Sequence, residues 1–354
     1  MTRAYTSVLS NPREARTVLR LQQAFMASEP RRKRAQQELG VDVPPFLIAS
    51  IATTCNLSCA GCYARANGIA ADEGQGRRQV MKPEEWRAVF EEAAKLGINF
   101  ALLAGGEPLT RRDILQQVAE VKDMIFPIFT NGTMFSPWYL DFFAKNLNLI
   151  PVISVEGNRV TTDARRGEGV YQRALKAMDC LHEANLFYGV SLTVTTENFA
   201  QITSDEYVDS LRERGCKLVI YVEYVPTDEG TEHLALSPAD SELMEQAQER
   251  LMQRYDNMVV ISFPGGEKKM GGCLAAGRGF FHIGPDGAAE PCPFSPYSDA
   301  SVRTIGIAGA LKSPLFRKLR DSRLVGGEHD GGCVLWEHRA EVEAMLNEPA
   351  TTEA

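Results

Sequence analysis

The sequence predicts an α/β fold, in which helices cover a parallel β-sheet and a smaller domain follows. From residue 46 to residue 255, short apolar runs alternate with amphipathic segments about six times, as in parallel strands joined by crossover helices. From Gly265 onward, short segments rich in Gly, Cys and Pro replace this alternation. The 354 residues suffice for both parts. We therefore expect an N-terminal helical extension (1–45), a sheet domain (46–264) and a second domain (265–354).

The expected elements follow one another along the chain. Residues 12–38 are predicted to form one charged, amphipathic helix, which Pro44-Pro45 ends. Strands are expected at 46–51, 99–103, 125–129, 150–155, 189–195 and 217–225. Helices are expected at 83–96, 111–122, 137–144, 170–185, 200–214 and 238–255. The second domain is expected to contain a hairpin of 280–283 with 288–290, and a final helix from Leu335 to about Leu346.

Composition and charge argue against several classes of protein. The chain is 44% hydrophobic and 24% charged, which is ordinary for a globular protein. The net charge of -8 argues against nonspecific nucleic-acid binding, and the basic run 31–34 is expected to be a solvated helix face. No run of about 18 uncharged apolar residues occurs, so no membrane span is expected. Charges near the N-terminus predict no signal peptide, and we expect a cytoplasmic location.

Three cysteines follow the first expected strand. Cys55, Cys59 and Cys62 form a Cys-x3-Cys-x2-Cys run. Three thiolates this close in a cytoplasmic protein are metal ligands more often than disulfide partners. Three protein ligands on a four-iron cluster leave one iron open, and an open iron can bind and activate a small molecule. The run therefore predicts an iron–sulfur site that does more than carry electrons.

Polar side chains gather where the other expected strands end. A Gly-Gly-Glu-Pro run at 105–108 follows the second strand, and Ser154 and Glu156 share one face at the end of the fourth. In parallel α/β folds, ligands bind at the carboxyl ends of the strands. Two glycines let the backbone approach a ligand closely, and a carboxylate accepts from an ammonium group. We therefore expect the ligand site at this edge of the sheet.

The cysteine run and the Gly-Gly-Glu-Pro run, each directly after a strand, resemble the radical S-adenosylmethionine (SAM) superfamily. The resemblance implies an enzyme with a partial (β/α)6 TIM-like barrel. It implies a 4Fe–4S cluster on Cys55, Cys59 and Cys62, whose open iron takes the amino and carboxylate groups of SAM. The reduced cluster would cleave SAM to methionine and a 5′-deoxyadenosyl radical, which abstracts hydrogen from a substrate C–H bond. A flavodoxin- or ferredoxin-type reductant is expected.

The same resemblance assigns the SAM contacts. It implies that the SAM amino group lies on the Gly-Gly-Glu-Pro run, and that one arginine of the pair after the fourth strand, Arg166 in preference to Arg165, contacts the carboxylate. The expected cofactor-binding residues are Gly105, Gly106, Glu107, Pro108, Asn131, Ser154, Glu156, Arg166, Ser191, Tyr224 and Val225. Two positions depart from the family. Gly61 stands where an aromatic residue usually lies near the adenine, and Glu156 stands where Asp is more common.

A second cysteine set lies in the C-terminal domain. Cys273, Gly287 and Cys292 have the spacing of SPASM and twitch domains, which bind auxiliary iron–sulfur clusters, and Cys333 is the natural third ligand. With only three cysteines left, we expect one auxiliary 4Fe–4S cluster in a shortened, twitch-like domain. Its fourth ligand is open between substrate, water and a side chain such as that of His329 or Asp330. A zinc site with three Cys and one His is the structural alternative. The remaining cysteines, Cys180 and Cys216, are expected to be small buried residues.

The substrate class and the outcome after hydrogen abstraction stay open at this point. Only about 45 residues precede the expected barrel, fewer than the leader-binding domain of many peptide modifiers, which favours a small-molecule substrate. A ribosomal-peptide-modifying SPASM maturase is the alternative within the family. A noncatalytic iron–sulfur electron carrier or redox sensor is the alternative of another class. It would explain the cysteines but not the polar residues at the strand ends.

Overall fold

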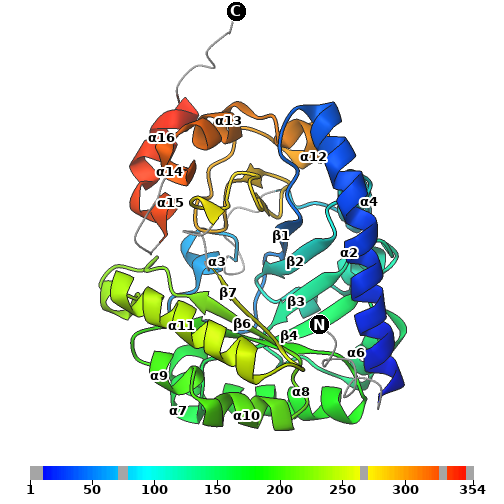
Figure 1. Ribbon diagram of the computed structural model, residues 1–354, viewed down its shortest axis with the longest axis vertical. Helices are drawn as coiled ribbons and strands as arrows, with labels where there is room; N and C mark the ends of the chain where they lie inside the picture. Colours follow the sequence, from blue (N-terminus) through cyan, green and yellow to red (C-terminus); the bar gives the residue numbers. More distant parts are fainter. Residues whose placement is uncertain (1–10, 71–78, 264–269, 327–332, 348–354) are drawn as a thin grey trace, which may run out of the picture.

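The computed structural model describes residues 11–70, 79–263, 270–326 and 333–347. In these residues one sheet runs through the molecule in the order β7-β6-β5-β4-β3-β2-β1-β8-β9 (Figure 1). Neighbours from β7 to β8 are parallel, and only β8 and β9 pair antiparallel. Strands β1 to β7 are adjacent in chain order, as in a TIM barrel. The predicted α/β class, a partial barrel of parallel strands, is confirmed.

Strands β1 to β6 coincide with the apolar runs of the sequence, and none of their residues is exposed, as expected under a layer of helices. The bounds of the strands are β1 Phe46–Ala52, β2 Phe100–Gly105, β3 Phe126–Thr130, β4 Leu149–Val155, β5 Gly189–Val194, β6 Leu218–Glu223, β7 Val259–Phe263, β8 His282–Ile283 and β9 Ala289–Glu290. The sheet extends beyond the six expected strands, because β7 adds a parallel strand next to β6. Its residues Val259 and Ile261 are exposed while Val260 is buried. This edge strand therefore lacks the continuous apolar run that marks the others.

The helices follow the expected order, with several additions. They are α2 Pro12–Leu39, α3 Tyr63–Ala66, α4 Pro83–Leu96, α5 Arg112–Ala119, α6 Pro137–Lys145, α7 Arg159–Arg166, α8 Val170–Glu183, α9 Phe199–Ile202, α10 Asp205–Glu213, α11 Pro238–Arg254, α12 Val302–Ala310, α13 Pro314–Asp321, α14 Arg323–Gly326, α15 Val334–Glu337 and α16 Arg339–Asn347. The helix expected at 200–214 is divided, because the Ser204 hydroxyl accepts from Tyr207 N and starts α10 anew. The expected final helix is likewise divided at His338.

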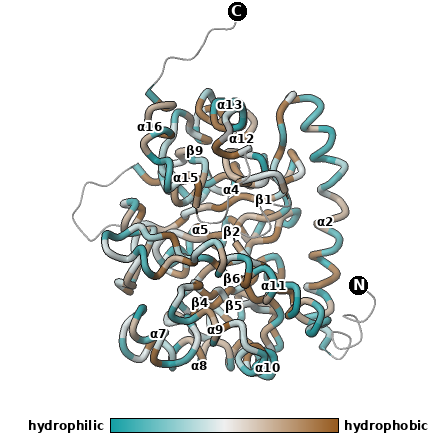
Figure 2. Tube along the Cα trace, turned by 60° about the vertical axis from the view of Figure 1, so that its left-hand side comes forward, coloured by the Kyte–Doolittle hydropathy of each residue, from teal (hydrophilic) through white to brown (hydrophobic). Residues whose placement is uncertain are grey.

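Helix α2 lies along one side of the molecule (Figure 1). Figure 2 shows that this helix is largely hydrophilic, whereas the strands are apolar. Its Ala24 packs on Ile125 and Ile150, which stand at the amino ends of strands β3 and β4. Gly97 lets it approach α4, since a Cβ there would overlap the Arg32 backbone nitrogen. The helix thus covers the end of the barrel opposite to the predicted site. Among the described residues, no helix is both long and apolar enough to cross a bilayer.

The C-terminal segment joins the same sheet. Strand β8 pairs in parallel with β1, and the Ile48 N–H donates to Phe281 O at 3.0 Å. The predicted hairpin is confirmed as β8 and β9. Helices α13, α14 and α16 gather at one end of the molecule, opposite α7 and α10 (Figure 1). The expected boundary at 264/265 falls outside the described residues, so the division into domains stays a prediction.

Candidate active site at the carboxyl ends of the strands

The loop that carries Cys55, Cys59 and Cys62 starts where β1 ends, and its thiols are partly buried. Two distant elements hold this loop. The Ala60 N–H donates to Arg165 O on α7 at 2.9 Å. The Gly61 N–H donates to Asp228 Oδ2, after β6, at 3.1 Å. Because both contacts use the backbone of the loop, all three thiols stay free of these restraints and can bind a ligand.

The thiols lie close enough to influence one another. Burial raises the pKa of Cys55, and the negative charges of Glu107, Cys59 and Cys62 raise it further. A positively charged iron–sulfur centre would relieve this repulsion and favour the thiolate forms. No three His, Cys, Asp or Glu side chains of the described residues converge as the ligands of a single metal ion would. A four-iron cluster presents its irons at separate corners, so its thiolates do not need to meet at one point.

The Gly-Gly-Glu-Pro run presses against the start of the cysteine loop. Gly106 N–H donates to Ala52 O at 2.7 Å, and Glu107 N–H donates to Thr54 O at 2.8 Å. A Cβ on Gly106 would overlap the Thr54 carbonyl oxygen, and Gly105 has a φ of +108°. Only glycine allows this approach. The run therefore sets the Glu107 side chain beside Cys55.

Glu107 is 1% exposed and held by three donors. Its Oε1 accepts from Leu109 N at 3.0 Å and from Thr130 Oγ1 at 2.7 Å, and its Oε2 accepts from Asn131 N at 2.8 Å. Burial is the main reason that the pKa of Glu107 is raised. A cationic ligand group beside this carboxylate would favour its ionised form. The Asn131 amide in turn donates to Asn56 Oδ1 at 2.9 Å, which connects β3 to the cysteine loop.

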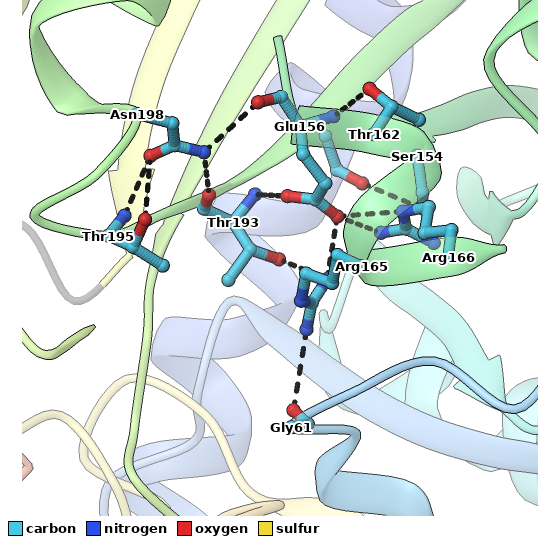
Figure 3. A network of polar contacts seen from close by, with 10 residues as sticks. Gly61, Ser154, Glu156, Thr162, Arg165, Arg166, Thr193, Thr195 and Asn198 are labelled. Atoms are coloured by element: carbon cyan, nitrogen blue, oxygen red, sulfur yellow. Dashed lines mark hydrogen bonds and ion pairs between the residues drawn. The ribbon is translucent and has the colours of Figure 1, made fainter. Parts of the chain in front are cut away.

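A second carboxylate, that of Glu156 after β4, forms ion pairs with both Arg165 and Arg166 (Figure 3). Its Oε1 lies 2.6 Å from Arg165 Nη1 and 2.5 Å from Arg166 Nη2, while its Oε2 accepts from Thr193 N at 3.0 Å. Arg165 also donates to Gly61 O at 3.3 Å. Two guanidinium groups on one carboxylate leave a net positive charge next to the cysteine loop. Such a charge suits a carboxylate of the ligand.

The other predicted contacts lie on neighbouring strands. Ser154 and Ser191 face each other across β4 and β5, with their hydroxyl oxygens 3.0 Å apart. Both are almost completely buried. Asn198 was not among the predicted contacts, although its amide donates to Glu156 O and Thr193 O at 3.1 and 2.8 Å. It ties the ends of β4 and β5 together, and its place directly after a strand was the available signal.

An aromatic side chain from another part of the sequence lies where the cysteine loop lacks its usual aromatic residue. A Cβ on Gly61 would lie 2.5 Å from Tyr224 Oη, so the ring of Tyr224 occupies the room beside Gly61. The Tyr224 hydroxyl donates to Thr231 Oγ1 at 3.0 Å. The sequence analysis included Tyr224 and Val225 among the cofactor-binding residues, but it did not predict that the Tyr224 ring lies beside Gly61. It had not found Asp228, which follows β6 and binds the loop through Gly61.

The second cysteine set flanks the β8–β9 hairpin. Cys273 and Cys292 are buried, and Cys333 caps the start of α15 and is partly buried. The segments that carry the first two meet where Ala276 N–H donates to Pro291 O at 3.2 Å. His329 and Asp330, the side chains considered as a fourth ligand, lie outside the described residues.

Cys216 is a buried thiol apart from both sets, as expected, and its Sγ donates to Leu218 O at 3.3 Å. Burial raises the pKa of Cys216 to about 12. At pH 8 roughly one thiol in ten thousand would then be ionised. We expect iodoacetamide to leave Cys216 unmodified in the folded, metal-free protein and to modify it after denaturation. Mass spectrometry of peptides measures this, and rapid native labelling of Cys216 would contradict its burial.

The partial barrel, the thiols at the end of β1 and the charged residues at the next strand ends define a class of enzyme that uses SAM and an iron–sulfur cluster. Residues 49–205 match the family model described as the Radical SAM superfamily. The chain thus contains a radical SAM domain, and a SPASM-like segment follows it. The thiols near one another and the buried Glu107 fit a 4Fe–4S cluster and SAM as its cofactors.

Known proteins resemble the chain along most of its length. It is 27% identical to the AdoMet-dependent heme synthase of Methanosarcina barkeri, over 83% of this chain and 89% of that one. It is 25% identical to the mycofactocin maturase MftC of Mycolicibacterium smegmatis, over 84% of this chain and 80% of that one. Its fold is similar to that of Streptococcus suis SuiB bound to precursor peptide SuiA. The TM-score is 0.66 at 18% identity, over 84% of this chain and 74% of that one.

Proposed function

We propose that Cys55, Cys59 and Cys62 hold the 4Fe–4S cluster and that the strand ends around them hold SAM. When bound and reduced, this cluster supplies the electron that cleaves SAM to methionine and a 5′-deoxyadenosyl radical, which abstracts hydrogen from a substrate C–H bond. One observation carries the proposal. The Glu107 backbone and the Arg165 guanidinium both bond to the cysteine loop, at Thr54 O and Gly61 O, although they come from different strand ends.

The charges of the site match the charges of SAM. Glu107 is buried and negative when ionised, so it can accept from the amino group. Arg166, with Arg165 beside it, can bind the carboxylate. Ser154 and Ser191 offer hydroxyl groups to the sugar. The oxygens of Glu156 already accept from both arginines and from Thr193 N, which supports a role in orienting the arginines in addition to the expected ribose contact.

The remaining proposed cofactor contacts are made by backbone or by small groups. These residues are Gly105, Gly106, Pro108, Asn131, Tyr224 and Val225. We place the adenine near the last two, where the Tyr224 ring lies against Gly61. The barrel residues 46–264 would then bind SAM, and 265–354 would carry the auxiliary 4Fe–4S cluster on Cys273, Cys292 and Cys333. A flavodoxin- or ferredoxin-type protein in the cytoplasm is the proposed reductant.

The substrate is proposed from two relatives of different kinds. The heme synthase has a small-molecule product by its name, and its similarity spans 89% of its length, which supports a small-molecule substrate. Peptide modification is the second candidate. It is supported by the similarity to a protein named as a maturase and by the fold shared with SuiB, which was crystallised with a precursor peptide.

The test of the proposed function begins with the wild-type protein. After anaerobic reconstitution with iron and sulfide, dithionite and SAM should give 5′-deoxyadenosine. Its rate should rise with the true substrate, so tetrapyrroles and short peptides are compared as additions. Deuterium transferred from labelled substrate into 5′-deoxyadenosine would identify the abstracted hydrogen. Absence of 5′-deoxyadenosine from a fully reconstituted protein, with both substrate classes supplied, would overturn the proposal and favour an electron carrier.

Replacing Glu107 with Ala should weaken SAM binding without loss of iron. Removing a buried, charged acceptor costs about 1.5–3 kcal/mol, roughly 10- to 100-fold in affinity. Equilibrium dialysis with labelled SAM measures the affinity, and an iron assay confirms the cluster. Glu120→Ala, which removes an exposed carboxylate at the end of α5, is the matched control. SAM affinity equal to that of wild type would remove Glu107 from the site.

A further inference from the structure

A row of four polar side chains, three of them buried, runs through the sheet beside the cysteine loop. His282 on β8 lies with Nδ1 2.6 Å from Glu290 Oε2 and with Nε2 2.8 Å from Ser50 Oγ. The phenol of the partly buried Tyr63 lies next to the Ser50 side chain. Ser50 and His282 are 0% exposed, and Glu290 is 2% exposed. Buried polar groups of this kind are stable only when each is paired.

The hydrogen-bond donors and acceptors of these side chains can all be paired in one arrangement. With Glu290 as a carboxylate, which only accepts, and a neutral His282 ring, Nδ1 donates to Glu290 and Nε2 accepts from Ser50. The single proton of Ser50 is then used, so its oxygen is left to accept from the neighbouring Tyr63 hydroxyl. A serine, a histidine and a carboxylate in this order also occur in hydrolases. Here Ser50 is fully buried in β1, where no substrate can reach it.

The two ends of this row lie next to the two cysteine sets. Tyr63 directly follows Cys62, and Glu290 stands two residues before Cys292. The Tyr63 ring also packs edge-on against Phe294, with centroids 5.4 Å apart. Close by, the Asn67 amide donates to Pro293 O at 2.7 Å. The segments that carry the two sets are therefore interlocked by hydrogen bonds and by an aromatic contact.

We propose that Tyr63, Ser50, His282 and Glu290 form a buried link through which the C-terminal cysteine segment positions the first cysteine loop. These four are positioning residues, since they need touch neither SAM nor substrate. Only the consequence of the link rests on the proposed function. This consequence is that the geometry of the SAM-binding loop depends on the C-terminal cysteine segment. The existence of the link depends on the fold alone.

Amide hydrogen exchange in the cofactor-free protein tests the link itself. Tyr63→Phe deletes one hydroxyl and keeps the ring on Phe294. We expect it to raise exchange at least several-fold in residues 280–292, far from it in sequence. His282→Gln should conversely raise exchange in residues 55–70. Tyr188→Phe, which deletes another buried phenol that donates to Arg214 O at 2.8 Å, is the matched control and should change neither segment. Effects confined to the neighbourhood of each substitution would overturn the link.

SAM affinity of the reconstituted protein tests the consequence. Tyr63→Phe and His282→Gln should each weaken SAM binding roughly five-fold. The double variant should bind no more weakly than either single variant, because both substitutions break the same link. His282→Leu, which leaves Glu290 unpaired, should be more severe, so that the amide of Gln acts as a partial rescue. Independent, additive losses, or none, would overturn the proposed positioning. A wild type that binds no SAM would refute the proposed function, while the exchange experiment would still decide the link.

Discussion

Cys59→Ala is expected to abolish the formation of 5′-deoxyadenosine from SAM. Removing one of three thiolates leaves the proposed cluster with two protein ligands and disrupts both its assembly and its open iron. The variant is reconstituted anaerobically, reduced with dithionite and incubated with SAM, and the nucleoside product is measured by chromatography. Iron content should fall at the same time, from about eight per chain toward about four, the content of the auxiliary cluster.

Cys180→Ala is the matched control for this experiment. Cys180 is a partly buried thiol on α8, outside both cysteine sets. This variant should keep the iron content and product formation of wild type. If Cys59→Ala still formed 5′-deoxyadenosine at the wild-type rate, the assignment of the first cluster to this loop would be wrong. Equal losses in both variants would indicate a general effect on folding instead.

Replacing Cys273, Cys292 and Cys333 together with Ala is expected to halve the iron content, from about eight to about four per chain. The variant should still cleave SAM, because the first cluster has its own three thiolates, but it should not turn over substrate. Iron analysis and the electron paramagnetic resonance spectrum of the reduced protein measure the loss of one cluster. The result would assign the second cluster to substrate binding or electron acceptance.

Two outcomes of the triple substitution would contradict the auxiliary cluster. An unchanged iron content would show that these cysteines hold no iron, and zinc in the wild-type protein would favour the structural alternative. Because Cys273 and Cys292 are buried, the fold of the variant must be verified, for example by its circular dichroism spectrum. Loss of SAM cleavage in a folded variant would extend the proposed link between the two cysteine segments from geometry to activity.

Local patterns predicted most of the fold. Helix α4 begins at Pro83 and ends before Gly97, because proline suits the first turn and glycine adopts the positive φ that ends the helix. Strands β1 to β6 were visible as apolar runs because none of their residues is exposed. Strand β7 was missed, since two of its five residues are exposed and the pattern resembled that of a loop.

The candidate site was predicted in part, because residues close in sequence were easier to find than residues that meet in space. The cysteine loop and the Gly-Gly-Glu-Pro run each carry their own signal. Asp228 does not, and its bond to Gly61 depends on how the segment after β6 returns to the loop. The close pairing of Glu156 with Arg165 and Arg166 likewise required the end of β4 and the end of α7 to be placed together.

By itself, the sequence determined the α/β class, and it predicted the chemistry of the cysteines and the edge of the sheet at which ligands would bind. These properties follow from hydrophobic periodicity and ligand spacing, which act over a few residues. Only the tertiary structure decided which distant groups meet, such as the Tyr224 ring against Gly61, and Ser50 against His282, 232 residues further along the chain. Such contacts depend on strand register and on the packing of whole elements, and neither is encoded in any single segment.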